Sequence, residues 1–311
     1  MKIALIGSAD FGRATLEAFL DRGDEVVAVF CAPDNPKSSK PDALKAGALA
    51  HGITPIQLPN LKGPDAIELM KKSGAEICVM AYVLQFVTQE LVMTPPLGTI
   101  QYHPSLLPKY RGPSAINWAI AQGESETGLT IFRPSDGLDE GAVILQKTVR
   151  IGADDTLGQV YFDHLFPMGV QALIEAADLV KAGQHHEHIQ DESQANYEGW
   201  FNAQAAQLHW GLHIHQLYNL IRAANPAPGA WCLYKGEKVQ IFDTRKHLSP
   251  TFASVSGKPG EVTHVTDTAI WVACHGGQLE ILKAKGPNGQ KVSGSELANA
   301  LGLTKGTFFD L

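Results

Sequence analysis

The side chains best suited to chemistry are an imidazole and a carboxylate, His103 and Asp139, which lie 36 positions apart in the chain. His103 follows a short apolar run, 97–100, that predicts a strand, and it begins a loop that ends at a glycine, 104–112. Asp139 lies in a turn with two glycines, 135–141, between two further strand-like runs. In open α/β sheets, ligands bind beyond the carboxyl ends of the strands. A carboxylate turned toward a histidine there can form an acid/base unit, in which the imidazolium donates a proton to developing negative charge.

Short motifs around these two residues carry a resemblance to a known family. His-Pro-Ser-Leu-Leu-Pro at 103–108, Arg-Gly at 111–112 and Gly-Leu-Asp-Glu-Gly at 137–141 resemble the 10-formyltetrahydrofolate-dependent formyltransferases. This family includes methionyl-tRNA formyltransferase, glycinamide ribonucleotide formyltransferase and the hydrolase domain of 10-formyltetrahydrofolate dehydrogenase. The resemblance extends over nearly the whole chain. The segments most similar to the hydrolase domain are Gln85–Val87, Tyr102–Pro108, Ser114–Trp118, Leu165–Pro167 and Tyr197–Gly199.

The resemblance implies a reaction and a set of site residues. It implies formyl transfer from 10-formyltetrahydrofolate as a co-substrate, with release of tetrahydrofolate, and it implies no metal and no NAD(P). By the same resemblance, His103 stabilises the oxyanion as an acid, while Asp139 orients His103 and accepts a proton. The remaining residues carried over from the family are those of the pterin pocket, Gln85, Phe86 and Val87, and those of the substrate loop, Ser105, Leu106, Leu107 and Pro108.

Gln101 departs from the family pattern. The transferases have Asn two residues before the histidine, with its amide pointing at the formyl oxygen, whereas the hydrolase domain usually has an apolar residue. Gln keeps the amide donor but adds a methylene, and a displacement of ~1 Å can lower a rate about a hundredfold. The overall likeness favours water as the formyl acceptor. Transfer to methionyl-tRNA or a small amine, and folate binding with little turnover, stay open as alternatives.

Strand and helix patterns alternate through the first part of the chain, which predicts a Rossmann-like, mainly parallel sheet. The glycine pattern after the first strand imitates a dinucleotide site, but Ala9 replaces its middle glycine. An amphipathic helix is predicted at 155–182, and Pro167 and Gly169 predict two pieces or a kink. The catalytic domain is expected at 1–183 and a polar linker at 184–205.

The chain changes character after the linker. Residues 206–311 combine one predicted helix with many short strands and Gly/Pro turns, which predicts a β-rich, OB-like domain. Residues 1–205 carry 15 Lys/Arg and 25 Asp/Glu, and residues 206–311 carry 10 and 7. This slightly basic domain permits an anionic partner such as tRNA, but the charge density is below that of a nucleic-acid footprint.

Composition excludes several classes of protein. The N-terminus lacks the apolar region of a signal peptide, and no run reaches the ~18 apolar residues of a membrane helix. His209 and His213 are spaced like zinc ligands, but Trp210 stands where a metalloprotease needs Glu. Four cysteines without a Cys-x-x-Cys motif predict reduced thiols in a cytoplasmic protein. The sequence makes no prediction of oligomeric state.

Overall fold

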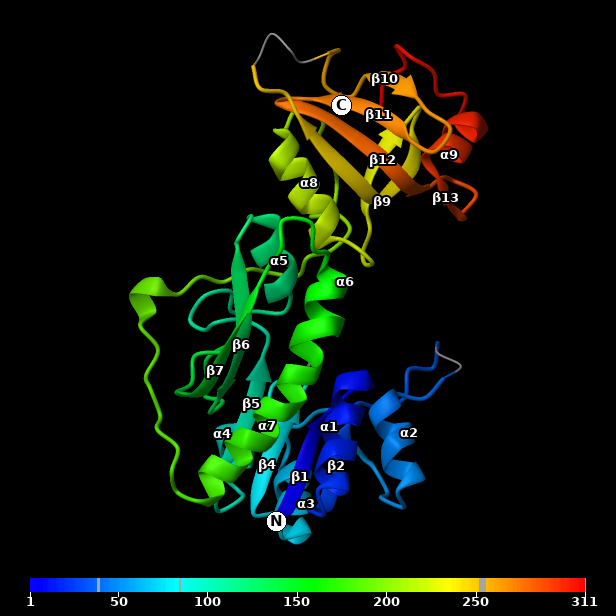
Figure 1. The fold of residues 1–311 in the computed structure, drawn as a ribbon. Coiled ribbons are helices and arrows are strands. Elements are labelled where there is room, and N and C mark those ends of the chain that lie inside the picture. Colours follow the sequence, from blue (N-terminus) through cyan, green and yellow to red (C-terminus); the bar gives the residue numbers. More distant parts are fainter. Residues whose placement is uncertain (38–39, 84, 252–255, 311) are drawn as a thin grey trace. The chain divides into compact units, whose positions relative to one another are not determined.

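The structure, a computed structural model, describes residues 1–37, 40–83, 85–251 and 256–310. By packing, the chain divides into two units that do not follow the order of the sequence (Figure 1). The first unit comprises Met1–Gly112, Gly128–Val149 and Phe162–Tyr197. The second comprises Pro113–Thr127, Arg150–Tyr161 and the described chain from Glu198 onward. The predicted domain boundaries at 183/184 and 205/206 divide the chain by position in the sequence, whereas these two units are defined by packing. The boundaries therefore stay a prediction.

A seven-stranded sheet, in the order β3-β2-β1-β4-β5-β6-β7, forms the centre of the first unit. Its strands are β1 (Lys2–Gly7), β2 (Glu25–Cys31), β3 (Ile56–Gln57), β4 (Ile77–Ala81), β5 (Thr99–His103), β6 (Glu126–Phe132) and β7 (Val143–Arg150). The five strands from β3 to β5 pair in parallel, and β6 pairs antiparallel with β5. The predicted Rossmann-like, mainly parallel sheet is therefore confirmed.

Helices cover this sheet and complete its core. They are α1 (Ala9–Asp21), α2 (Ala43–Ala50), α3 (Pro64–Ser73), α4 (Gln89–Val92) and α7 (Phe166–Lys181). Ala4 and Ile6 of β1 share one buried cluster with Met70 of α3 and Leu91 of α4. Tyr102 of β5 instead packs on Phe11 of α1, with ring centroids 4.4 Å apart. Side chains two residues apart along a strand face the same side of the sheet. Ala4 and Ile6 of β1 therefore reach the same buried cluster.

Two glycines allow backbones to approach where a side chain would collide. A Cβ on Gly7, at the end of β1, would lie 2.3 Å from the carbonyl oxygen of Ala81. A Cβ on Gly169, in α7, would lie 2.6 Å from the Tyr102 ring. The first glycine of the dinucleotide-like pattern is thus required by strand packing, and Gly169 by the contact of α7 with β5.

The long helix predicted at 155–182 is built from three pieces. A short α6 (Leu157–Gln159) continues into a π-helix, η1 (Val160–Leu165), and then into α7. Pro167 occupies the first turn of α7, directly after η1. The interruption predicted from Pro167 is thus a change of helix type, which is a recognised cause of irregularity in long helices.

Helix α5 (Ala115–Ala121) follows Ser114, a residue type that often caps helices, but Ser114 does not cap it. The Ser114 hydroxyl oxygen accepts a hydrogen bond from the Phe201 amide at 3.0 Å, and the helix receives no side-chain cap. Asn117 donates its side-chain amide to the carbonyl of Ala223, in α8 (Ile214–Ala223), at 2.8 Å. A tertiary contact therefore uses the hydroxyl that local rules assign to the helix end.

The second unit contains a six-stranded antiparallel sheet, in the order β10-β11-β12-β9-β8 with β13 beside β12. Its elements are β8 (Ala230–Tyr234), β9 (Glu237–Leu248), β10 (Val262–Val265), β11 (Ile270–Cys274), β12 (Gly277–Lys285), β13 (Lys291–Ser293) and the helix α9 (Gly294–Leu301). This confirms a β-rich C-terminal domain.

The C-terminal tail joins the two edge strands of this sheet. The Val262 amide of β10 donates to the Thr307 carbonyl at 2.8 Å, and the Asp310 amide donates to the Leu233 carbonyl of β8 at 2.9 Å. Between them, Phe309 is 1% exposed and stacks on Trp210 with ring centroids 5.5 Å apart. The tail thus provides the closure that an OB-like barrel needs.

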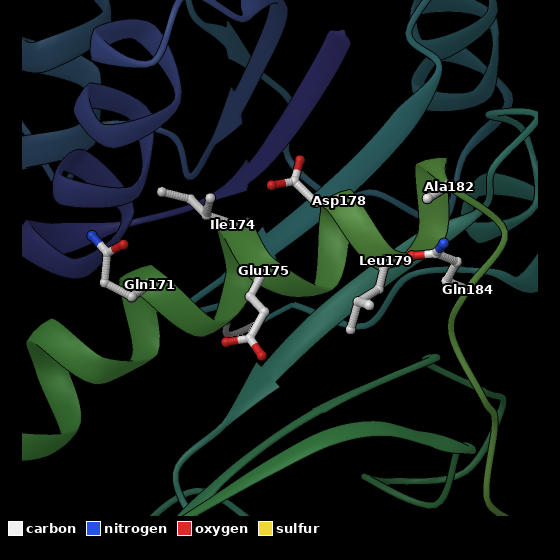
Figure 2. A pocket seen from close by; sticks show the side chains of 7 residues that line it. All are labelled: Gln171, Ile174, Glu175, Asp178, Leu179, Ala182 and Gln184. Carbon is white, nitrogen blue, oxygen red and sulfur yellow. The ribbon is translucent and has the colours of Figure 1, made fainter.

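A hollow of about 440 Å³ runs along α7 (Figure 2). Two carboxylates line it, and both have cationic partners: Glu175 pairs with Lys147 at 2.6 Å, and Asp178 pairs with Arg22 at 2.7 Å. Because these charges are already compensated, the hollow offers no uncompensated group to a ligand.

Because the C-terminal tail joins the two edge strands through the buried Phe309, we expect this side chain to contribute to the free energy of unfolding. Phe309→Ala should lower the free energy of unfolding by about 3 kcal/mol or more, because it leaves a cavity against Trp210. Phe308→Ala is the matched control: Phe308 is 43% exposed, and its loss should cost less than about 1 kcal/mol. Urea unfolding followed by circular dichroism measures both, and equal losses would contradict closure by Phe309.

Candidate active site

The candidate site lies at the carboxyl end of β5. His103 is the last residue of this strand and is only 6% exposed. The neighbouring strand β4 runs parallel to β5, with Met80 opposite Gln101. The segment that follows β4, with Gln85, Phe86 and Val87, therefore leaves the sheet at the same edge as His103. This is the edge at which open α/β sheets bind ligands.

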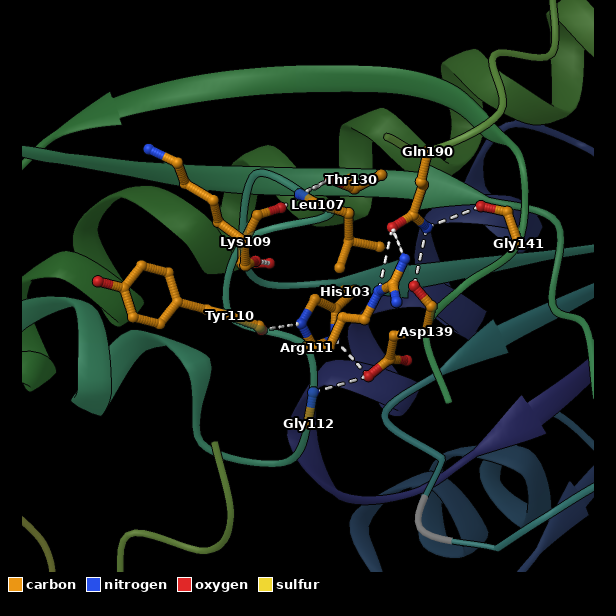
Figure 3. A network of polar contacts seen from close by, with 11 residues as sticks. His103, Leu107, Lys109, Tyr110, Arg111, Gly112, Thr130, Asp139, Gly141 and Gln190 are labelled. Carbon is orange, nitrogen blue, oxygen red and sulfur yellow. Dashed lines mark hydrogen bonds and ion pairs between the residues drawn. The ribbon is translucent and has the colours of Figure 1, made fainter. Parts of the chain in front are cut away.

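Thr130 of β6 holds the loop that follows His103 (Figure 3). Its hydroxyl donates to the Ser105 carbonyl at 2.7 Å and accepts from the Leu107 amide at 3.1 Å. The Gln146 side-chain amide of β7 donates to the Leu107 carbonyl at 2.8 Å. The Ser105 hydroxyl closes the loop on itself by donating to the Lys109 carbonyl at 2.6 Å. The loop is therefore fixed by two neighbouring strands.

The two ring nitrogens of His103 have different partners. Nε2 lies 2.8 Å from the carbonyl oxygen of Tyr110, and a carbonyl only accepts, so Nε2 carries the proton and donates it. Nδ1 lies 3.5 Å from Asp139 Oδ2, in a contact in which both side chains are less than a tenth exposed. This separation is longer than a good hydrogen bond, as is common in catalytic pairs without ligand. Nδ1 thus faces a carboxylate, while Nε2 is bound to the backbone.

Asp139 is held in a backbone conformation that few residues adopt. Its φ is 57°, in the left-handed region, which costs a non-glycine residue about 1 kcal/mol and which Asp and Asn tolerate best. The Gly112 amide donates to Asp139 Oδ2 at 3.0 Å. This bond ties the end of the histidine loop to the aspartate turn, so the two halves of the site hold each other.

Arg111 and Gln190 form a clamp behind the pair (Figure 3). The Gln190 amide nitrogen donates to the carbonyls of Asp139 and Gly141, each at 2.8 Å, and its oxygen accepts from Arg111 Nη2 at 2.9 Å. Arg111 also donates two hydrogen bonds to the exposed Glu192, at 2.9 and 2.6 Å. These bonds raise the pKa of Arg111, so its guanidinium stays charged. One glutamine thereby connects both loops of the site.

The segment expected as a linker supplies several of these contacts. His188 pairs with Val143 of β7 in an antiparallel bridge. Asn196 accepts from the Tyr110 amide at 2.6 Å through its side chain, and from the Arg111 amide at 3.0 Å through its carbonyl. The polar residues of this segment, which resemble solvated linker in the sequence, hold the backbone that carries the Tyr110 carbonyl.

The other predicted site residues are placed as follows. Gln101 is half-buried and lies two residues before His103 on β5, and its role stays a prediction. Gln85 Oε1 is buried and has no hydrogen-bond partner in the described part of the chain, while Phe86 is 62% exposed. The Ser105 hydroxyl bonds within the loop, and the Leu107 amide and carbonyl bond β6 and β7. Substrate binding by the residues carried over from the family, Gln85, Phe86, Val87, Ser105, Leu106, Leu107 and Pro108, stays a prediction.

Sequence reasoning missed Thr130, Gln146, Gln190 and Asn196. Thr130 and Gln146 lie in strands, where the alternation of apolar and polar residues does not indicate which hydroxyl or amide makes tertiary hydrogen bonds. Gln190 and Asn196 lie in a segment without periodicity. Only Arg111 had a signal, because it belongs to the Arg-Gly motif.

Further features restrict the chemistry. Among the residues that the structure describes, no group of three or more His, Cys, Asp or Glu side chains could hold a metal ion. All four cysteines are free and buried, and burial raises the pKa of Cys31 to about 11 and of Cys78 and Cys274 to about 12. Within the described ranges, no helix is long and apolar enough to cross a bilayer.

Comparison with known families decides what this site belongs to. The family model described as "Formyl transferase" matches residues 1–177, and the model "Formyl transferase, C-terminal domain" matches residues 202–302. The chain belongs to the formyl transferase family. The resemblance carried by the His103 and Asp139 motifs is therefore confirmed.

Two kinds of curated relatives are similar to this formyl transferase chain. Cytosolic 10-formyltetrahydrofolate dehydrogenase of Xenopus laevis is 35% identical over 278 residues, covering 87% of this chain. The match spans only 30% of that dehydrogenase's length. Methionyl-tRNA formyltransferase of Syntrophus aciditrophicus is 30% identical over 311 residues, covering 99% of this chain and 98% of the relative.

Solved structures share the fold. HypX from Aquifex aeolicus, in complex with tetrahydrofolic acid, superposes with a TM-score of 0.68 at 18% identity, covering 97% of this chain and 47% of HypX. WlaRD, a sugar 3N-formyl transferase solved in the presence of dTDP and 5-N-formyl-THF, gives 0.68 at 17% identity, covering 93% and 99%. At these identities the likeness shows the formyl transferase fold alone.

The clamp makes a prediction for the local stability of the site. Gln190→Ala removes the bonds to both loops, so the Gly112 amide should exchange its hydrogen at least about tenfold faster, because the loops open more often. Gln194→Ala is the matched control, since the Gln194 side chain bonds only Asp191 of its own turn at 2.8 Å. Hydrogen exchange read by NMR measures Gly112, and unchanged protection in Gln190→Ala would contradict the clamp.

Proposed function

We propose that this chain cleaves 10-formyltetrahydrofolate at the formyl–N10 bond, with water as the acceptor, to release tetrahydrofolate and formate. The observation that carries the proposal is the buried pair of His103 Nδ1 and Asp139 Oδ2, 3.5 Å apart at the ligand-binding edge of a formyl transferase sheet. The name of the dehydrogenase relatives, 35% identical in this region, supports 10-formyltetrahydrofolate as the substrate.

The chemistry needs two functions that this pair combines. The water oxygen attacks the formyl carbon, and a tetrahedral intermediate forms whose oxygen carries negative charge. His103 acts here as the imidazolium, protonated on both ring nitrogens, and its Nδ1–H donates to that oxygen, a contribution of the oxyanion-hole type. Asp139 accepts a proton from the attacking water. The carbon–N10 bond then breaks as Asp139 passes to N10 the proton it took from the water, and the formic acid so formed loses its remaining proton to solvent and leaves as formate.

The hydrogen bond from Nε2 to the Tyr110 carbonyl supports Nδ1 as the nitrogen that acts. Because Nε2 already donates to a backbone carbonyl at 2.8 Å, only Nδ1 can serve both the substrate and Asp139. The ring cannot turn over without losing that bond. This assigns the acid role to Nδ1 and the proton-accepting role to the aspartate.

The pterin end of the folate would lie beside the segment that follows β4. Gln85 Oε1 is a buried acceptor without a partner in the described chain, an arrangement that costs about 1–3 kcal/mol until a donor arrives. A pterin ring carries N–H donors that can supply this bond. The exposed Phe86 ring offers an apolar surface to the same ligand.

A second function is supported by a separate observation. The methionyl-tRNA formyltransferase relative matches along 98% of its own length, which includes the C-terminal domain. Transfer to an amine, on tRNA or on a small molecule, would use the same His103 and Asp139 with a different nucleophile. The presence of Gln101 instead of Asn keeps a third outcome open, folate binding with little turnover.

Replacing either member of the pair should remove turnover. Asp139→Asn keeps a residue that tolerates the left-handed backbone and an oxygen for the Gly112 amide, and it removes only the proton acceptor. Release of tetrahydrofolate without added acceptor should fall about 10²- to 10⁴-fold in Asp139→Asn and in His103→Gln. Glu140→Gln, at a neighbouring side chain that is 50% exposed, is the control and should stay near wild type. A drop of similar size in the control would refute the assignment.

Gln101 gives a prediction on the acceptor. If its amide reaches the formyl oxygen, Gln101→Asn withdraws the donor by ~1 Å and should lower acceptor-free turnover about a hundredfold. Gln240→Asn, in β9 of the second unit, is a control for the same chemical change. Wild type that turns over only when an amine is supplied would overturn water as the acceptor. Activity that appears only in Gln101→Asn would identify a folate binder.

A further inference from the structure

A second pocket lies within the second unit, apart from the residues of the candidate active site. Its volume is about 820 Å³, which is within the range of small-molecule sites. It is lined by the turn after α5, the stretch after β7, one face of α8 and a lysine of β9. Its lining includes the polar and charged side chains of Glu124, His215, Asn219, Arg222 and Lys246 and the apolar side chain of Ile151.

Arg222 is a buried cation without a carboxylate partner. It is 6% exposed, and its guanidinium donates to the carbonyls of Gly152 and Asp155 at 3.2 and 2.7 Å and to Asn219 Oδ1 at 2.8 Å. In the described part of the chain, Nε has no partner, and no carboxylate lies within 4.0 Å of the guanidinium. Burial lowers the pKa of Arg222, and the nearby Asp154 and Asp155 offset this only in part.

The two nearest carboxylates are engaged elsewhere. Asp154 accepts from the Tyr218 hydroxyl at 2.8 Å, and Asp155 accepts from the Gly152 amide at 2.7 Å. The folded chain thus places two acids near Arg222 but directs their oxygens to other donors. A buried charge held only by neutral oxygens is unusual, because buried charges are normally paired.

A lysine and a histidine also line the pocket. Lys246 Nζ lies 4.5 Å from the centre of the Tyr218 ring, and no ion pair to a carboxylate is formed by it among the described residues. Burial lowers the pKa of His215, and nearby Lys246 and His213 lower it further. Glu124 is the one carboxylate among the lining residues. The lining therefore has an excess of positive charge that an anion would relieve.

A glycine contributes to the open space. Gly123 lies at φ +82°, and a Cβ there would come within 2.8 Å of the Asn219 amide. Ile151, Ala121 and Ala153 add apolar surface to the lining. The pocket thus combines cations on α8 and β9 with an apolar part large enough for more than a free ion.

We propose that this pocket binds a small phosphate monoester, with its phosphate held by Lys246, His215 and Arg222 and its organic part against the apolar lining. A phosphate monoester carries about two negative charges at neutral pH and three acceptor oxygens, which suits a cluster of cationic donors. Nothing in the proposed formyl chemistry requires this site, so it is an additional one.

Calorimetric titration of the full chain at constant ionic strength tests the proposal. Ribose 5-phosphate and AMP should bind saturably, inorganic phosphate more weakly, and adenosine not at all. Lys246→Ala should weaken ribose 5-phosphate binding about tenfold or more, because it removes a charge-assisted contact. Lys238→Ala is the matched control, since Lys238 lies on the same strand but over the Trp231 ring.

The outcomes are distinct. His215→Ala provides a second variant that leaves the turn braced by Arg222 intact, and it should also weaken binding. Absence of saturable binding by wild type, or equal affinity in Lys246→Ala and Lys238→Ala, would overturn the proposal. Inorganic phosphate that binds as tightly as the esters would overturn the role of the organic part. Tetrahydrofolate release by Lys246→Ala should match wild type, which separates this site from the proposed function.

Discussion

The hydrogen bond from His103 Nε2 to the Tyr110 carbonyl, at 2.8 Å, is the constraint on which the rest of the site depends. It fixes the rotation of the ring, and so it turns Nδ1 toward Asp139. The surrounding hydrogen bonds hold the Tyr110 carbonyl and the Asp139 carboxylate in place. Asn196 holds the amides of Tyr110 and Arg111, and Gly112 donates to Asp139 from the next residue of the same loop. The site is preorganised because one short loop carries the partners of both side chains.

The left-handed backbone at Asp139 follows from the same constraint. A carboxylate that must face the end of β5 from a tight turn needs a backbone that few residues adopt, and the surrounding bonds compensate its strain. Gln190 binds the carbonyls on both sides of the turn, and Arg111 fixes Gln190 in turn. Gln190 thus holds the backbone that carries Asp139.

Much of this arrangement could be predicted from the sequence, and the limits have a physical reason. Strand and helix alternation predicted the parallel sheet, and local motifs predicted that His103 and Asp139 belong to one family of sites. Local rules failed at Ser114, whose hydroxyl binds a distant amide instead of capping α5. They also gave no indication of Gln190, because its four hydrogen bonds reach three residues that lie 49 to 79 positions away along the chain. Contacts between residues so far apart in the sequence depend on the folded topology, and no short stretch of the sequence predicts them.

The most direct test of this account is a crystal structure with a bound analogue of 10-formyltetrahydrofolate that resists cleavage. We expect the oxygen equivalent to the formyl oxygen within hydrogen-bond distance of His103 Nδ1, with Nε2 still donating to the Tyr110 carbonyl and Asp139 beside the carbon. An analogue that meets Nε2 instead, or one that binds away from the carboxyl end of β5, would contradict the central claim.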